Sequence, residues 1–506
     1  MQPGLQCPVV FDNAVMNDGE EKQNKSDGQS YGLPTENKFE WSVQQALQKL
    51  HGTFGLAIAC SDLPDTLIGA KKGSPLILGV GDNEYILASD AAAIVEHTTQ
   101  AIYLADNEMV AVRPDGFHTK TIDNIAVSKE LKQIEFSLEQ IELGDFPYHM
   151  LKEIFEQPKT LSTCMGGRID SHNNRIKLGG IDSYLRDLTR TRRLILTACG
   201  TAFHAGLVGE FLFEQLARIP AETEYASEFR YRNPIIEDGT VVISISQSGE
   251  TLDTLAAVEE AKERGATVLG IVNVVGSSIA RATDAGIYLH AGPEIGVAST
   301  KAFTAQVTVL TMLAIELGRR RHISSDQANK YIEELSQIPD KISQILKQSD
   351  HIKQIASANI DQENWLFLGR GFNYPVALEG ALKLKEISYI HAEGLPAAEM
   401  KHGPIALIVD GMPVVFIATA GPQYNKIMGN IAEVRARGGK TIVVATQGDE
   451  NIKQHADYLI TIPDAPEPLQ PMLTVVPLQL LAYHAAVLRG HDVDKPRNLA
   501  KSVTVE

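Results

Sequence analysis

The feature that most constrains this chain is an internal repeat, in which a short apolar strand runs into a glycine-containing turn and then into a helix. Residues 193–200 share this pattern with 365–371, and 262–272 share a second stretch with 435–445; the offset is about 170 positions in both comparisons. Short apolar strands that alternate with helices are typical of parallel, doubly wound sheets. The repeat therefore predicts an α/β fold with two tandem domains of one kind.

The segments around the repeat predict a different organisation. Residues 12–38 are polar with little periodicity, as in disordered segments, and a short helix at 43–50 precedes several strand-like runs. We expect Pro158 to end a linker helix and a helix at 328–346 to join the repeated domains. The predicted parts are an atypical or disordered segment (1–38), a partial α+β block (39–120), a linker (121–182), two repeated domains (183–322 and 353–496) and a tail (497–506).

Composition excludes several classes of function. With 506 residues and a formal net charge of −17, the chain has no basic surplus that could release phosphate counterions, so a nucleic-acid binder is not expected. The cysteines are far apart and form no Cys-x-x-Cys pair, which fits a reducing cytosol and offers no metal site. No signal peptide and no apolar run of roughly 18 residues is recognised. We expect a cytoplasmic protein without a metal, a cofactor or a membrane partner.

A hydroxyl-rich turn follows the apolar run at 241–245. It reads Ser-Gln-Ser-Gly-Glu-Thr at residues 246–251 and leads into a predicted helix. Free backbone N–H groups at a helix start, together with hydroxyls, favour phosphate binding. An ordinary helix N-cap accounts for the serines equally well. The turn has no Gly-x-Gly-x-x-Gly and no Walker lysine, so a nucleotide is not indicated.

Two later segments carry residues suited to a sugar site. The loop at 294–301 is rich in small residues and precedes a long helix, although a capped helix start would look the same. Glu379, Lys383 and Glu386 fall on one face of a helix with apolar flanks. Such residues most often form solvated ion pairs. A carboxylate held among apolar groups can instead transfer protons at neutral pH.

His402 and Lys501 are candidates with an ordinary structural explanation. A loop histidine is more often structural than catalytic, and a lysine close to a C-terminus is usually solvated. The segment at 496–506 is nevertheless apolar enough to dock. A docked lysine amine can form an imine with a ketose.

Taken together, these segments resemble the glutamine–fructose-6-phosphate aminotransferase (isomerizing) family, whose members are also called glucosamine-6-phosphate synthases. The resemblance runs from about residue 50 to residue 506, with the motifs in the family order, at residues 151–158, 199–201, 246–251, 294–303, 379–386, 401–404 and 496–506. It implies two sugar-isomerase (SIS) domains that form D-glucosamine 6-phosphate from fructose 6-phosphate in amino-sugar biosynthesis. It also implies glutamine or ammonia as nitrogen source, and a homodimer.

The resemblance further implies roles for individual residues. Glu386 is expected to move a proton between C1 and C2 of the sugar, with Lys383 supporting the charge arrangement. Lys501 is expected to form a Schiff base with the open ketose, and His402, supplied by a second subunit, to assist ring opening. The implied substrate-binding residues are Thr201, Ser246, Gln247, Ser248, Thr251, Val297 and Ser299. One departure is Ala202, where the family usually has serine, which puts one substrate hydrogen bond in doubt.

The N-terminal part departs further from the family. Family members carry a glutaminase domain whose chain begins with a cysteine, followed by an Arg-Trp motif and an Asn-Gly oxyanion loop. Here residue 2 is Gln2, Cys7 lies inside the chain, and neither motif occurs before His51. We therefore expect a truncated glutaminase block without a nucleophile, and no glutamine hydrolysis.

Two alternatives stay open beside the aminotransferase interpretation. The chain could act only as a phosphosugar isomerase, or as a non-catalytic SIS-domain sugar-phosphate sensor. A sensor would keep the turn at 246–251 but lose Glu386, His402 or Lys501. All three residues are present, which favours the enzyme.

Overall fold

The computed structural model describes residues 35–134, 142–170 and 175–501. Its contacts divide the chain into two compact units, a smaller one at residues 1–139 and a larger one at 140–503. Each unit is considered by itself. Most of the segment expected to be disordered or atypical, at residues 1–34, lies outside the described residues.

The smaller unit contains one long helix and two antiparallel sheets, with strand orders β1-β2-β6-β7-β8 and β4-β3-β5-β9. Alternate residues of β6 belong to two different apolar clusters, so both faces of its sheet are covered. One cluster includes the helix, and the other includes the second sheet. The elements are α1 (Thr35–Leu47), β1 (Phe54–Cys60), β2 (Leu63–Lys72), β3 (Ile77–Val80), β4 (Tyr85–Ala88), β5 (Gln100–Tyr103), β6 (Glu108–Arg113), β7 (Gly116–Thr121), β8 (Ala126–Val127) and β9 (Lys132–Gln133).

Two features of this unit differ from the expectations. The helix expected at 43–50 begins at Thr35, inside the segment at 12–38 whose polarity suggested disorder, and ends at Leu47. Its Glu40 is nearly buried, and the carboxylate pairs with Arg113 (2.5 Å), His118 (3.0 Å) and Lys120 (3.1 Å) of the sheet. The unit also continues past residue 120, because β8 and β9 pair with β7 and β5.

The larger unit contains two parallel five-stranded sheets, which confirms the predicted α/β fold. Their orders are β13-β12-β14-β15-β16 and β18-β17-β19-β20-β21. In both sheets the second strand along the chain is the edge strand, next to the first. The order reverses between β12 and β14, and again between β17 and β19, where ligands usually bind at the strands' carboxyl ends. The strands are β12 (Arg193–Ala198), β13 (Ala221–Tyr225), β14 (Thr240–Ser246), β15 (Thr267–Val272), β16 (Ala285–Tyr288), β17 (Asn364–Gly369), β18 (His391–Pro396), β19 (Pro413–Ala418), β20 (Lys440–Thr446) and β21 (Tyr458–Ile462).

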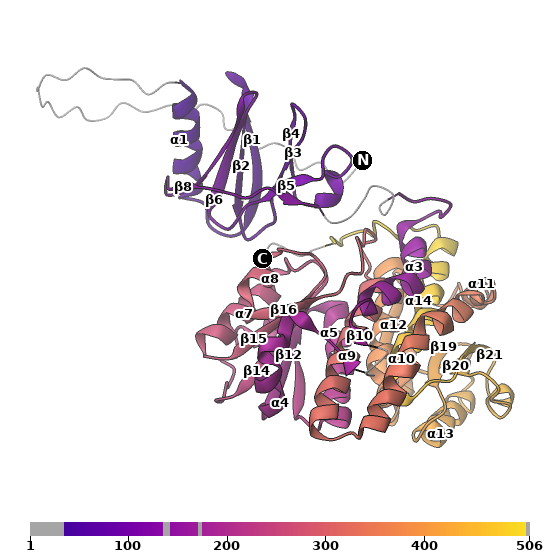
Figure 1. Cartoon of the computed structure of the whole chain (residues 1–506). Helices are drawn as coiled ribbons and strands as arrows, with labels where there is room; N and C mark the ends of the chain where they lie inside the picture. Colours follow the sequence, from indigo (N-terminus) through magenta and orange to yellow (C-terminus); the bar gives the residue numbers. More distant parts are fainter. Residues whose placement is uncertain (1–34, 135–141, 171–174, 502–506) are drawn as a thin grey trace, which may run out of the picture. The chain divides into compact units, whose positions relative to one another are not determined.

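Helices between the two sheets join the repeated domains into one body (Figure 1). A single apolar cluster contains buried residues of both domains, among them Leu196 of β12 and Phe367 of β17. α5 of the first domain contacts α12 of the second, and this contact sets the site described below. The main helices are α3 (His149–Met165), α5 (Gly200–Leu212), α7 (Leu252–Glu263), α9 (Lys301–Arg321), α10 (Ser325–Leu346), α11 (Ser349–Ala358), α12 (Asn373–Ser388), α13 (Tyr424–Arg435) and α14 (Gln470–Leu488).

Shorter elements complete the larger unit. They include a hairpin, β10 (Ile169–Asp170) with β11 (Arg175–Ile176), and the short helices α4 (Leu185–Arg190), α6 (Ala226–Phe229) and α8 (Ser278–Ala282). A π-helical turn at Phe213–Ala217 extends α5. Turns of 3₁₀ helix lie at Gly179–Tyr184, Glu399–His402, Pro404–Leu407, Ile452–Gln454 and Glu467–Leu469.

Pro158 does not end the linker helix as expected, because α3 continues to Met165. A proline in a helix leaves the carbonyl four residues earlier without its N–H donor. That carbonyl belongs to Ile154, and it accepts instead from Nε2 of Gln157 at 3.0 Å. The same Nε2 donates to Oε1 of Gln479 on α14 at 2.9 Å. The buried glutamine therefore supplies the bond that the proline removes.

The expectation that no segment could cross a membrane also needs correction. The stretch Glu467–Leu488, which contains α14, is long and apolar enough by length and composition. In the larger unit 89% of its window is buried, and α14 packs against α10, α11 and α12. The apolar side chains of this stretch are therefore part of the shared core.

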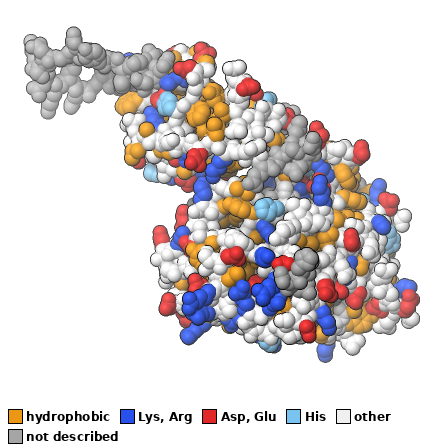
Figure 2. All heavy atoms as spheres, in the orientation of Figure 1, with side chains coloured by type: hydrophobic (Ala, Val, Ile, Leu, Met, Phe, Trp, Pro, Cys, Tyr) orange, Lys and Arg blue, Asp and Glu red, His pale blue; other side chains and the backbone are white. Residues whose placement is uncertain are grey.

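Figure 2 shows charged side chains of both signs on the visible face of the molecule.

Candidate active site

The hydroxyl-rich turn lies at the carboxyl end of β14. Oγ of Ser246 accepts the N–H of Gly249 at 2.9 Å and lies 3.3 Å from Oγ1 of Thr251. Oγ of Ser248 accepts the N–H of Glu250 at 3.1 Å. α7 begins directly after Thr251, so its free N–H groups are at the same place. The turn therefore collects hydroxyls at the positive end of a twelve-residue helix.

Only glycine fits at residue 249. Its φ of +67° lies in the left-handed region, and a Cβ there would lie 2.0 Å from Oγ of Ser277. The neighbouring Glu250 carboxylate is used to hold the turn, since it accepts both the N–H (2.8 Å) and the hydroxyl (2.7 Å) of Ser278. The turn is thus fastened to the start of α8.

Thr201 lies in the adjacent turn, at the carboxyl end of β12. β12 and β14 are hydrogen-bonded neighbours, and Oγ1 of Thr254 on α7 lies 3.6 Å from Sγ of Cys199. The two turns therefore meet where the strand order reverses. Ala202, the residue that departs from the family, is buried in the first turn of α5.

The side chain of Thr201 joins a buried acid–base cluster on α12. Its Oγ1 lies 3.0 Å from Oε1 of Glu379 and 3.0 Å from Nζ of Lys383. The second oxygen of Glu379 lies 2.8 Å from Nδ1 of His204. Glu379 is completely buried, and Lys383 is 1% exposed. The predicted charged face of α12 is therefore an internal surface that meets α5.

Glu386 completes this cluster one turn further along α12. Its Oε2 lies 2.6 Å from Nζ of Lys383, whereas Oε1 of Glu379 lies 3.5 Å from the same nitrogen. Burial disfavours the ammonium, but the Glu386 and Glu379 carboxylates outweigh it and raise the pKa of Lys383. The side chain of Glu386 is 21% exposed, so it is the acid of the cluster that reaches an open surface.

Lys501 is docked rather than solvated. Its Nζ donates to Oε2 of Glu294 at 2.9 Å and to the carbonyl of Gly296 at 2.7 Å. The other oxygen of Glu294 accepts the N–H groups of Thr300 (2.8 Å) and Ala302 (3.1 Å). Burial favours the neutral acid, but the Lys501 ammonium and these N–H groups lower the pKa of Glu294 to about 2. The part of the tail beyond Lys501 lies outside the described residues.

The loop that holds Lys501 is also joined to the hydroxyl-rich turn. Asn273 donates its N–H to the carbonyl of Gln247 (3.2 Å), and its side chain bonds the carbonyl of Gly292 (2.8 Å) and the N–H of Ala291 (2.9 Å). Val297 and Ser299, further along this loop, are half-buried. The structure thus brings three of the predicted segments together within the first domain and its border with the second.

His402 is the predicted site residue that is not brought into this group. It lies in an exposed 3₁₀ turn, Glu399–His402. No hydrogen bond or ion pair within residues 35–134, 142–170 and 175–501 links it to Lys383 or Lys501.

Three residues of the site were missed by the sequence interpretation. Glu294 stood in a predicted loop, but its contact with Lys501 spans 207 positions. His204 and Asn273 carry no local signal, because an isolated polar residue in an apolar stretch is usually structural. Their roles follow only from contacts between distant segments.

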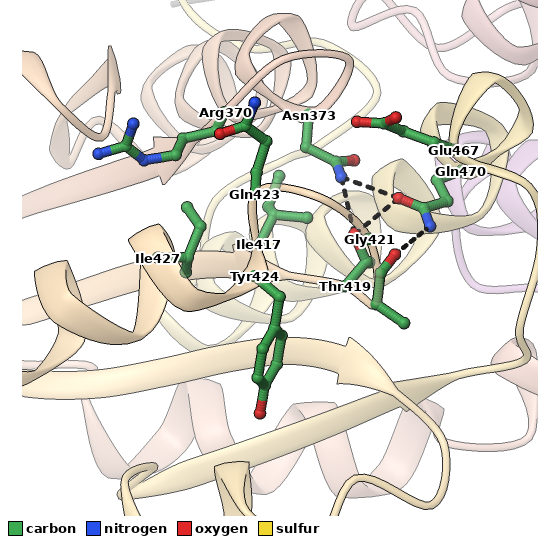
Figure 3. Close-up of a pocket in the computed structure, with 11 residues that line it drawn as sticks. Arg370, Asn373, Ile417, Thr419, Gly421, Gln423, Tyr424, Ile427, Glu467 and Gln470 are labelled. Atoms are coloured by element: carbon green, nitrogen blue, oxygen red, sulfur yellow. Dashed lines mark hydrogen bonds between the residues drawn. The ribbon is translucent and has the colours of Figure 1, made fainter.

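The second domain has a hollow at the equivalent place, where β17 and β19 end (Figure 3). There the polar side chains bond one another: Nδ2 of Asn373 donates to Oγ1 of Thr419 (3.0 Å), which donates to Oε1 of Gln470 (2.7 Å). Nε2 of Gln470 donates to the carbonyl of Ala420 at 2.9 Å. The Thr419 hydroxyl is thus bonded on both sides, whereas the turn of the first domain gathers three hydroxyls at a helix start, which points to the first domain as the site.

Comparisons with known proteins show the family of this chain. The SIS domain family matches residues 187–316 and 360–489. The glutamine–fructose-6-phosphate aminotransferase (isomerizing) of Chlorobaculum tepidum is 57% identical over 467 residues, which cover 92% of this chain and 76% of that protein. The enzyme of the same name from Bacteroides thetaiotaomicron is 54% identical over 468 residues, with the same coverage.

Solved structures show the same relationship for the larger unit. The C-terminal domain of glucosamine-fructose-6-phosphate aminotransferase from Francisella tularensis is 38% identical, with a TM-score of 0.67, over 70% of this chain and 99% of that one. Glucosamine-6-phosphate deaminase from Thermotoga maritima, at 22% identity and a TM-score of 0.53 over 70% of this chain and 99% of that one, shares the fold. From these matches, this chain belongs to the glutamine–fructose-6-phosphate aminotransferase (isomerizing) family.

Proposed function

We propose that this chain forms glucosamine 6-phosphate from fructose 6-phosphate at the carboxyl ends of β12 and β14, where the hydroxyl-rich turn, α12 and the loop that holds Lys501 meet. The observation that carries this proposal is the contact of Thr201 with Lys383 (3.0 Å), which joins the strand end beside the hydroxyl-rich turn to the helix of Glu386. A primary amine, a carboxylate base and an anion-binding turn within reach of one another are suited to imine and proton-transfer chemistry on a ketose phosphate.

The phosphate of the sugar binds at the start of α7. The hydroxyls of Ser246, Ser248 and Thr251 and the free N–H groups of the helix favour an anion there. The neighbouring hydroxyls and carbonyls of the carbohydrate are held by Thr201, Gln247, Val297 and Ser299. Ala202, buried in α5, lacks the hydroxyl that the usual serine of the family would offer. We expect this difference to change the affinity for the substrate more than the rate of the chemical steps.

Glu386 acts as the base that moves a proton between C1 and C2. Glu379 is fully enclosed, so of the two acids beside Lys383 only Glu386 reaches the open side of the cluster. Lys383 and Thr201 then hold the charges in place. A positioned acid–base group of this kind typically raises the reaction rate by roughly two to four orders of magnitude.

Lys501 forms the imine. As the free amine its Nζ attacks C2 of the open ketose, a C–N bond forms, and the former carbonyl oxygen leaves as water after taking up protons. The ammonium at Glu294 must first lose a proton, since only the neutral amine has the lone pair that attacks. Ammonia, from glutamine or from solution, then displaces the lysine.

We further propose that the protein works as a homodimer in the cytoplasm, with His402 supplied by the partner subunit. Support comes from the exposure of His402 in a stretch of chain that also exposes two apolar side chains, Leu407 (55%) and Val409 (62%). Exposed apolar groups beside a polar residue are typical of surfaces that bind another protein.

The function is tested by following glucose 6-phosphate, formed from fructose 6-phosphate, with a coupled dehydrogenase, beside glucosamine 6-phosphate formation from ammonia and from glutamine. We expect isomerisation and ammonia-dependent amination. Isomerisation without any amination would favour a phosphosugar isomerase. Tight binding of fructose 6-phosphate without turnover would favour a sensor, and either result would overturn the proposal.

A further inference from the structure

Glu153, on α3, is a buried carboxyl group that has no part in the chemistry proposed for Glu386 and Lys501. Its side chain is 3% exposed. One oxygen, Oε1, accepts the N–H groups of Ile295 (2.5 Å) and Gly296 (3.1 Å). These two residues directly follow Glu294, so Glu153 holds the loop on which the amine of Lys501 is docked.

Gly296 connects the two groups directly. Its N–H is bonded to Glu153, and its carbonyl accepts from Nζ of Lys501 at 2.7 Å. The opposite acceptor of Lys501 is Glu294, at 2.9 Å. A shift of Glu153 would therefore move the carbonyl of Gly296 that accepts from Lys501.

The second oxygen of Glu153 faces the same loop without a hydrogen bond. Oε2 is buried and has no hydrogen-bond partner among the described residues. It lies 3.0 Å from where a Cβ on Gly296 would be, a tight contact that shows how closely the two residues pack. A buried carboxylate oxygen without a donor disfavours the ionised form.

The charged groups that act on Glu153 come from three other elements. They are Glu294 in the loop, Lys501 in the tail and Lys301 at the start of α9. On its own helix, Glu156 pairs with Lys301 at 2.8 Å. Burial and the Glu294 charge outweigh the two lysines and raise the pKa of Glu153 to about 8.

We propose that Glu153 is a positioning residue for Lys501. Glu153 fixes the loop whose Gly296 carbonyl accepts from the amine of Lys501, and it sets whether one or two carboxylate charges lie near that amine. This inference rests on the proposed role of Lys501 in imine formation. At neutral pH Glu153 is a neutral acid, so Lys501 faces the single charge of Glu294. As the pH rises through about 8, Glu153 ionises, and a second negative charge then attracts the Lys501 side chain and lowers its reactivity.

Competitive labelling of Lys501 with trace acetic anhydride, from pH 6 to 10, tests this without any substrate. The full chain, Glu153→Gln and Glu156→Gln are compared against a free-amine standard, with the peptide that contains Lys501 read by mass spectrometry. The amide introduced by Glu153→Gln keeps an oxygen that can accept from Ile295 and Gly296 but cannot ionise. Glu156→Gln is the matched control, one turn along the same helix and paired with Lys301.

We expect the wild-type protein and Glu153→Gln to label alike below about pH 7. Above about pH 8.5, Lys501 should react up to about tenfold faster in Glu153→Gln, because the second carboxylate charge is absent. Glu156→Gln should follow the wild type throughout. Coincident curves over the whole range, or an equal change at every pH, would overturn the proposal.

Two further readouts keep the inference separate from the proposed function. If Glu153→Gln does not fold, the wild-type curve alone decides: a break near pH 8 supports the proposal, and a single-group curve overturns it. Borohydride trapping of Lys501 with fructose 6-phosphate tests the imine independently. Failure of trapping with the labelling result intact would contradict the proposed function and leave the charge effect of Glu153 established.

Discussion

Oε2 of Glu294 lies 2.9 Å from Nζ of Lys501, while Oε1 of the same fully buried carboxylate accepts the N–H groups of Thr300 and Ala302. One acid therefore connects the C-terminal tail to the start of α9. Since this acid is enclosed, the position of the tail depends on a group that solvent does not screen.

Replacing Glu294 with Gln should reduce isomerisation by at least about tenfold, because Lys501 loses its charged partner and its fixed position. The unfolding free energy should fall by about 1–3 kcal/mol, as when a buried hydrogen-bonded group loses its partner. Coupled assays and urea unfolding measure the two effects. Glu450→Gln, which removes an exposed pair with Lys453, should change neither. Wild-type activity in Glu294→Gln would contradict the role of this pair.

Stability should also depend on Glu294 in acid. Its folded pKa is about 2 against an ordinary value of 4.5, so its ionised form stabilises the fold above pH 4.5. That contribution is lost as the pH falls from 4.5 to 2, and it is on the order of 3 kcal/mol. Urea unfolding at several pH values should show a shallower acid loss in Glu294→Gln than in the wild type. Parallel curves would show that the carboxylate is not stabilised as described.

Replacing Glu386 with Gln should reduce isomerisation by about 10²–10⁴-fold and leave binding of fructose 6-phosphate nearly unchanged. The amide keeps the shape of the side chain but cannot take a proton from carbon. Calorimetry measures binding, and the coupled assay measures turnover. The exposed Glu363 offers a control, since Glu363→Gln should behave like the wild type. Retained turnover in Glu386→Gln would assign the base to another residue.

Gly249→Ala should weaken substrate binding and stability together. Its left-handed φ strains any side chain, by about 1–2 kcal/mol, and the Cβ would also collide with Oγ of Ser277. The turn must then shift, so KM should rise more than kcat falls. Gly265→Ala provides the comparison, because Gly265 has φ +84° but open space for a Cβ. Equal KM values in the two variants would show that the collision does not disturb the turn.

Subunit exchange should decide where His402 acts. If His402 serves the partner's site, a heterodimer of His402→Ala and Glu386→Gln chains contains one intact site and one doubly altered site. Co-expression with two affinity tags should then restore about half of the wild-type activity, although each variant alone is nearly inactive. No recovery in the purified heterodimer would place His402 in the site of its own chain or outside it.

The sequence alone determined the two repeated α/β domains, and it named candidate site residues that stay predictions. The repeat works because each domain buries its own strands as short apolar runs, so the pattern needs only local information. The motif around Glu379, Lys383 and Glu386 was also legible, because apolar flanks mark a buried helix. Polarity was misleading at residues 35–38, which form the start of α1, and proline was misleading where Gln157 replaces the missing donor.

Only the tertiary structure decided which groups share the site. The partners Glu294 and Lys501 are separated by 207 positions, and Thr201 meets Glu379 across 178. Local pattern carries no information about such contacts, since they depend on how α5, α12 and the tail pack in a common core. The protonation of a buried acid follows from the same packing, because burial and neighbouring charges set its pKa. The sequence therefore specified which residue types are available, and the packing of distant segments decided which of them lie together and how they are protonated.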